Sequence, residues 1–245
     1  MALFDDLGFR WDRSSVPSTL PAHSVERACF HFHRMLPEFV WDAGVLEGNP
    51  FTFPEVKTLL EGVTVGGHRL SDQEQILNLA ESAKSLLAQV KSEQFTLDKS
   101  TFCGLHAIVA RREALEWGHF RGEGHEDSYT PHVSVATLKS CPPFERATGF
   151  FLFGAMQQFF FDGNKRTSRL MMNGVLMSHG IDAINVPAAR AQEFNEKIVR
   201  FYLTKDATEM MVFLASCHPD AAAILDTDPE TAGTPKSRHN PGMTP

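Results

Sequence analysis

The sequence predicts a nearly all-α fold with one small β-hairpin, and three observations support this. Apolar residues recur at helical spacing over long stretches, among them 71–90 and 188–203. Glycines suited to helix ends follow several predicted helices, as Gly62 and Gly180 do. Residues 132–137, His-Val-Ser-Val-Ala-Thr, alternate as a short strand does. Helices therefore account for most of the chain and the hairpin for a small part.

The N-terminal part of the chain is expected to pass from an extended lead-in into helices. Residues 1–23 are rich in Ser and Pro, which favours an extended conformation. Ser24 is a suitable N-cap for a helix that ends or kinks at Pro37, because proline removes a helical N–H group. Residues 42–46 then form a short helical segment, which Gly48 closes.

Three further helices are predicted before the hairpin. The segment 54–60 has proline at its start and Gly62 after its end, the arrangement that helices favour. A longer helix begins at Ser71, and another covers 101–116. His106 lies on the apolar side of this last helix. It is expected to be a core histidine with satisfied hydrogen bonds rather than a ligand.

The second half of the chain is predicted to contain the hairpin, four more helices and a tail. Residues 118–124 are glycine-rich and polar and precede the alternating stretch. The tail, 218–245, is dominated by Pro, Asp, Thr, Gly and Ala and is expected to be disordered. The four helices are expected at 150–161, 164–179, 188–203 and 207–217.

Composition excludes several functional classes. The chain has 245 residues and a formal net charge of −7, and an acidic chain is a poor candidate for binding nucleic acid. Its four cysteines are scattered without a Cys-Xaa-Xaa-Cys pair, which argues against a cysteine zinc site or a disulfide framework. There is no secretory signal and no run of ~18 apolar residues, so a cytoplasmic protein without a membrane span is expected.

The most informative stretch is 158–169, Gln-Phe-Phe-Phe-Asp-Gly-Asn-Lys-Arg-Thr-Ser-Arg. Asp162 is suited to a hard cation, and Gly163 allows a tight turn into a helix that begins at Asn164. Arg166 and Arg169 then share one face of the first helical turn, where a helix N-terminus attracts anions. These residues predict a site for magnesium-bound polyphosphate. The alternative is a plain turn followed by solvated arginines.

This stretch resembles the signature of the Fic family, His-Xaa-Phe-Xaa-Asp-Gly-Asn-Xaa-Arg-Xaa-Xaa-Arg, most of whose members transfer AMP from ATP to a protein hydroxyl. The resemblance implies that Phe160 anchors the loop and that Asp162 holds Mg²⁺. It implies that Gly163 and Asn164 form the anion hole. It also assigns Lys165, Arg166 and Arg169 to nucleotide binding. The Asn-Lys-Arg-Thr sequence around Lys165 resembles the Doc-like branch of the family.

The first position of the signature departs from the family. Where the family has a histidine that serves as general base, this chain has Gln158. A general base needs a pKa near the working pH, and a glutamine amide does not titrate in that range. The nucleotide site therefore matches the family, while the chemical step is expected to be weakened. His125 and His132, in the predicted hairpin region, are the alternative sources of a base.

A second stretch, 43–52, is similar to the N-terminal inhibitory helix of Fic proteins, Ser/Thr-Xaa-Xaa-Xaa-Glu-Gly/Asn. The inhibitory glutamate falls on Glu47 and the stop after it on Gly48-Asn49, while Ala43 departs from the Ser/Thr position. The resemblance implies that Glu47 pairs with Arg169 and takes the place of the ATP γ-phosphate. The alternative is a surface glutamate before a glycine that ends a helix.

The resemblance implies an autoinhibited protein adenylyltransferase with ATP and Mg²⁺ as its substrate and cofactor. A target protein would dock on the hairpin flap near residues 130–137, and a homodimer is a further expectation. The predicted organisation is an N-terminal lead-in and helix (1–40), a Fic-like domain (41–217) and the tail (218–245). The alternative function is a catalytically inactive Fic pseudoenzyme that binds a nucleotide or a partner.

Overall fold

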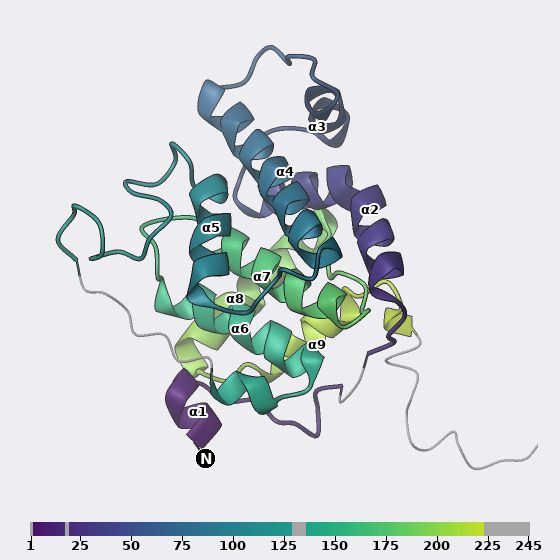
Figure 1. The fold of residues 1–245 in the computed structure, drawn as a ribbon, viewed down its shortest axis with the longest axis vertical. Coiled ribbons are helices and arrows are strands. Elements are labelled where there is room, and N and C mark those ends of the chain that lie inside the picture. The colour runs from purple at the N-terminus through teal and green to yellow at the C-terminus, as the bar shows by residue number, and fades with distance from the viewer. Residues whose placement is uncertain (1, 18–19, 129–135, 223–245) are drawn as a thin grey trace, which may run out of the picture.

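The computed structural model describes residues 2–17, 20–128 and 136–222, which form a bundle of helices (Figure 1). Within these ranges strand-like pairing is limited to two isolated bridges, Arg10 with Asp206 and Ala22 with Ile181. The all-α prediction is therefore confirmed. The α-helices are α1 Ala2–Leu7, α2 Val25–Leu46, α3 Phe53–Leu60, α4 Leu70–Lys91, α5 Lys99–Val109, α6 Pro143–Gln157, α7 Asn164–Ser178, α8 Ala191–Thr204 and α9 Thr208–Ser216, and the 3₁₀ helices are η1 Thr137–Ser140 and η2 Ala188–Arg190.

Helix α7 lies at the centre of the bundle and contacts α2, α4, α5 and α6 (Figure 1). Its closest partner is α6, and the two helices approach tightly where Gly154 faces Ser168. A Cβ added to Gly154 would lie 2.1 Å from the Ser168 Oγ, so a larger residue does not fit there. One continuous core of buried apolar residues runs from Leu7 to Ala215 and surrounds α7. The central helix is thus held on several sides.

Buried polar contacts fix the segments at the ends of the central helices. Asp42 in α2 accepts hydrogen bonds from the Asn185 side chain and, at 2.6 Å, from the Ala188 N–H. Burial raises the pKa of this carboxyl. Asn173 in α7 makes a double hydrogen bond with the backbone of Ile184, at 2.9 and 3.0 Å. These contacts hold the chain after α7 against both α2 and α7.

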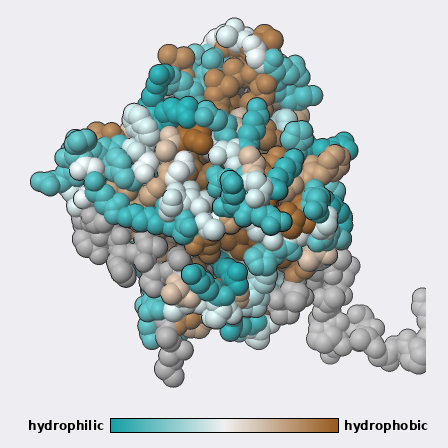
Figure 2. All heavy atoms as spheres, in the orientation of Figure 1, coloured by the Kyte–Doolittle hydropathy of each residue, from teal (hydrophilic) through white to brown (hydrophobic). Residues whose placement is uncertain are grey.

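The protein surface is mixed in character. Figure 2 shows hydrophilic side chains over much of one face and apolar ones at the top of the view, where α3 lies. Phe53, Val63 and Leu70 are exposed in or beside α3 and at the start of α4. In the described part of the chain, we find no helix with the length and apolarity needed to cross a lipid bilayer.

Helix α2 differs from its predicted form, because it continues through Pro37 to Leu46 as one element. Proline forfeits one backbone hydrogen bond, but Leu36, Phe39 and Val40 around it are buried, and packing overrides the local preference. Ser24 caps the start of the helix as predicted, with its side chain accepting from the Arg27 N–H at 3.1 Å.

Other element bounds also differ from the predictions. The lead-in contains helix α1, and α5 ends at Val109 instead of continuing to residue 116. Helix α6 starts at Pro143, a favourable first position for proline, and ends at Gln157, so the prediction of a helix over 150–161 is wrong at both ends. The aromatic run 159–161 belongs to the loop that follows.

Two predictions fall mainly outside the described residues. The alternating stretch 132–137 is described only at Ala136, which lies in a turn, and at Thr137, which begins η1, so neither residue is in a strand. Most of the predicted tail lies at 223–245, outside the described ranges. Of its first residues, His218 is buried against the helical body.

Candidate functional site

The motif loop, residues 158–163, joins the end of α6 to the start of α7. Gly163 has a φ of 75°, in the left-handed region that glycine adopts without steric penalty. A Cβ at this position would also lie 3.3 Å from the Cβ of Ala110 and 3.4 Å from the His106 ring. Helix α7 begins at Asn164, as predicted, so its first-turn N–H groups are available beside the loop.

The Asn164 side chain closes the loop. Its Oδ1 accepts from the Phe160 N–H at 2.9 Å, and its Nδ2 donates to the Phe160 carbonyl at 2.8 Å. The same Nδ2 donates to the Gln158 Oε1 at 3.2 Å. Because both polar ends of Asn164 are engaged, an anion at this helix start would meet its backbone N–H rather than its side chain.

His106 supports the loop from α5. Its ring stacks on Phe160 with centroids 3.6 Å apart and planes 5° apart. Its Nδ1 accepts from the Gly118 N–H at 3.0 Å, so its Nε2 carries the proton and donates to the Asp162 carbonyl at 2.9 Å. Burial lowers the pKa of His106 to about 4, which keeps the ring neutral. The expectation of a satisfied core histidine agrees with this geometry.

Arg166 is buried and paired with a residue that sequence reasoning missed. Its Nη1 donates to the Glu113 carboxylate at 2.6 Å, and its Nη2 lies 3.5 Å from the Asp162 carboxylate. Gln75 also donates to Glu113, at 3.0 Å. Glu113 follows the end of α5, 53 residues before Arg166, and no local pattern indicates this pairing. The two carboxylates hold the guanidinium fork beside the motif loop.

Glu47 reaches the same site from the end of α2. Its carboxylate lies 3.6 Å from the Arg169 guanidinium and 3.4 Å from the Lys165 ammonium, so the predicted contact with Arg169 is present. Gly48, with a φ of 78°, turns the chain away directly after it. Burial lowers the pKa of Arg169, and the Glu47 charge opposes that shift. The guanidinium Nε and Nη2 have no hydrogen-bond partner among the described residues.

Gln158 stands at the end of α6 with a φ of 52°, an uncommon conformation for a residue other than glycine. Its amide nitrogen donates to the Ala155 carbonyl. Together with Glu47 and residues 162–166, it lines a cavity of about 50 Å³. Sites for small-molecule ligands typically measure about 300–1,000 Å³, so this cavity is much smaller than a typical ligand site.

The segment before the predicted flap packs on the motif loop. The Phe120 ring stacks on Phe159 with centroids 4.9 Å apart, and the Arg121 N–H donates to the Phe159 carbonyl at 2.9 Å. Of the two alternative bases, His125 is exposed, and His132 lies outside the described ranges. Most of the stretch predicted to bind a target, 130–137, is likewise outside them.

Comparison with known proteins identifies the fold. No family model matches the chain. Among solved structures, Fic-1 (residues 134–508) from C. elegans matches with a TM-score of 0.65 and 18% identity, over 92% of this chain and 68% of that one. A Fic domain containing signaling protein from Bacteroides thetaiotaomicron matches with a TM-score of 0.64 and 17% identity, over 91% and 94% of the two chains.

A Fic family protein from Desulfovibrio desulfuricans also matches, with a TM-score of 0.56 and 15% identity, over 86% of this chain and 78% of that one. The chain therefore has the fold of Fic domain proteins. The resemblance that the 158–169 motif carries in the sequence is matched by the arrangement of the helices around it.

Proposed function

We propose that this protein is a Fic-type adenylyltransferase that binds Mg-ATP, is restrained by Glu47 and is slowed by Gln158. The observation that carries the proposal is the position of the Glu47 carboxylate, which forms ion pairs with two cationic residues of the motif, Arg169 and Lys165. A carboxylate at this point occupies a place suited to a terminal phosphate. The substrate would be ATP, and the acceptor would be a Ser, Thr or Tyr hydroxyl of a target protein.

The start of α7 supports phosphate binding. Free N–H groups and the helix dipole favour an anion there, and Arg166 and Arg169 add two guanidinium groups. Arginine suits phosphate because its planar fork makes paired hydrogen bonds. Arg169 has buried nitrogens without hydrogen-bond partners among the described residues, and phosphate oxygens would satisfy them. We assign the α- and β-phosphates to the loop and Arg166, and the γ-phosphate to Arg169.

Asp162 fits the role of the magnesium ligand. Its side chain is 60% exposed, unlike the neighbouring arginines, and one of its oxygens accepts the Gly163 N–H. The second oxygen is free to meet a hard cation, which typically takes one or two carboxylates and several phosphate oxygens. Bound Mg²⁺ would neutralise developing charge on the phosphates.

In the proposed reaction, the hydroxyl oxygen of the target attacks the α-phosphorus, pyrophosphate leaves, and the hydroxyl proton passes to solvent water. Gln158 borders the cavity at the base position but accepts no proton at neutral pH. His106 cannot replace it, because both ring nitrogens are engaged and its pKa is about 4. General-base assistance is typically worth about 10²–10⁴-fold in rate. Positioning by Arg166 and Mg²⁺ would remain and would support slow transfer.

The second candidate is a pseudoenzyme that binds nucleotide without chemistry. It is favoured by the inward hydrogen bonds of Gln158 to Ala155 and Asn164, which hold this side chain in the loop. The polar residues kept around the cavity, including the exposed Asp162, favour the enzyme instead.

Incubation with α-labelled ATP, Mg²⁺ and a cell lysate tests the proposal, with the wild type and Glu47→Gly compared side by side. We expect label on protein to rise in the variant, because the γ-phosphate position becomes free. Absence of label in both proteins, together with retained ATP binding, supports the pseudoenzyme. Failure of both to bind ATP contradicts the nucleotide site itself.

A further inference from the structure

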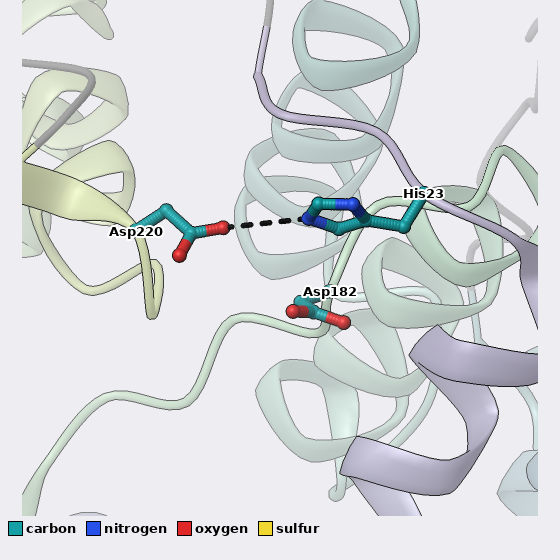
Figure 3. Close-up of side chains that lie close together, drawn as sticks. All are labelled: His23, Asp182 and Asp220. Atoms are coloured by element: carbon teal, nitrogen blue, oxygen red, sulfur yellow. Dashed lines mark ion pairs between the residues drawn. The ribbon is translucent and has the colours of Figure 1, made fainter.

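A cluster of metal-ligating side chains lies away from the motif loop. His23 precedes α2, Asp182 follows α7, and Asp220 follows α9, and their ligand atoms all lie within 4.8 Å of one another (Figure 3). Helix α7 has 15 residues, and at 1.5 Å per residue the cluster lies roughly 22 Å along its axis from the motif. Three segments distant in sequence therefore meet at one point.

The backbone fixes two of these segments against each other. The His23 N–H donates to the Gly180 carbonyl at 2.7 Å, and an antiparallel bridge pairs Ala22 with Ile181. Gly180 has a φ of 70°, and a Cβ there would lie 2.0 Å from the His23 carbonyl oxygen. Only glycine fits, so the backbone segments that carry His23 and Asp182 are held together before any ligand binds.

One carboxylate oxygen of Asp182 is unsatisfied within the described part of the chain. The side chain is 2% exposed, and its Oδ2 pairs with the His31 Nδ1 at 3.0 Å. Its Oδ1 is buried and has no hydrogen-bond partner among the described residues. An unpaired buried carboxylate oxygen is costly, and a cation removes that cost. His31 can donate to one oxygen while the other binds a metal, an arrangement that commonly orients carboxylate ligands.

We propose that this cluster binds a divalent first-row transition metal ion such as Zn²⁺ through His23, Asp182 and Asp220, with His31 orienting Asp182. One imidazole and two carboxylates suit such ions better than the all-oxygen sets that Mg²⁺ and Ca²⁺ prefer. The His23 Nε2 and Asp220 Oδ2 lie 3.9 Å apart. Donors about 2.1 Å from a tetrahedral Zn²⁺ lie roughly 3.4 Å apart, so small side-chain rotations close the site.

The position of the site defines its role. The ion would join the chain before α2 to the turn after α9, so that both are tied to the end of α7 (Figures 1 and 3). No reacting group of the motif loop takes part, and the role is structural. This inference does not depend on the proposed transferase activity.

Calorimetry with Zn²⁺ on the chelator-treated 245-residue protein tests the proposal, together with thermal unfolding. We expect one equivalent to bind saturably and to raise the Tm, because an ion that binds only the folded state stabilises it. His23→Gln and Asp220→Asn, both at partly exposed side chains, should each weaken binding at least tenfold. His31→Ala removes no ligand and should weaken it about 10–100-fold.

His33→Gln is the matched control, because His33 is exposed on the same helix as His31 and should leave binding unchanged. Metal-free Tm values near that of the wild type would show that the partly exposed variants are folded. Wild-type protein without saturable one-to-one binding overturns the proposal. So does binding that survives both His23→Gln and Asp220→Asn, since the two His–Asp contacts are then ordinary ion pairs.

Discussion

Replacing Glu47 with glycine should tighten Mg-ATP binding by about ten- to a hundredfold. The Glu47 carboxylate lies 3.6 Å from Arg169 and 3.4 Å from Lys165, and its side chain is 17% exposed. For unit charges 3.6 Å apart, Coulomb attraction is about 4–5 kcal/mol at an effective dielectric constant near 20. Solvent screening and the free-energy cost of burying Arg169 reduce the net interaction free energy.

The Glu47–Arg169 contact lacks a hydrogen bond, which lowers its value further. We therefore expect about 1.5–3 kcal/mol of the Coulomb value to remain as net competition from the two contacts together, and about 1.4 kcal/mol corresponds to tenfold in Kd. The gain should be larger for ATP than for ADP, because only ATP brings a γ-phosphate to the Arg169 position.

Calorimetry with Mg-ATP and Mg-ADP measures both effects. Glu61→Gly is the matched control. Like Glu47, Glu61 is a C-cap residue followed by a glycine, but it is exposed and has no ion pair among the described residues. An unchanged ATP affinity in Glu47→Gly, or an equal gain for ADP, would refute the reasoning.

Three further predictions concern the site and the α6–α7 packing. Arg166→Ala and Asp162→Ala should each weaken Mg-ATP binding about tenfold or more, since charge-assisted hydrogen bonds are worth about 1.5–3 kcal/mol; unchanged calorimetric affinity in both would reject the site. The pKa of His106 is lowered from 6.5 to about 4 on folding, so the unfolded chain binds the extra proton as pH falls below 6.5. The free energy of unfolding should therefore fall by about 2 kcal/mol between pH 7 and pH 5 because of His106. In urea unfolding measured across this pH range, His106→Gln should remove that part of the decrease. Gly154→Ala should destabilise the fold by about 1–3 kcal/mol because its Cβ meets Ser168, whereas an unchanged urea midpoint would contradict the α6–α7 packing.

Local signals predicted the parts of the site that depend on neighbouring residues. Gly163 and Asn164 mark a tight turn into a helix, and the structure places the left-handed glycine and the helix start there. Gly180 ends that helix as predicted. Turns and caps are set by a few adjacent residues, so a single sequence carries enough information for them.

Long-range contacts were not predictable in the same way. Glu113 pairs with Arg166 across 53 residues, and His23, Asp182 and Asp220 come from three separate segments. Nothing near each residue indicates its partners. At Pro37, by contrast, the local sequence predicted a break in the helix. Burial of the neighbouring side chains outweighs that preference, and the helix continues.

The most direct test of the central claim is AMP transfer by the double variant Glu47→Gly with Gln158→His. Mass spectrometry of the protein itself, after incubation with Mg-ATP, would detect the added AMP. We predict strong self-labelling or target labelling in the double variant, little or none in the wild type, and loss of labelling when Asp162→Ala is added. A double variant that binds ATP and transfers nothing would contradict the transferase account, and wild-type labelling equal to that of the double variant would contradict the roles given to Glu47 and Gln158.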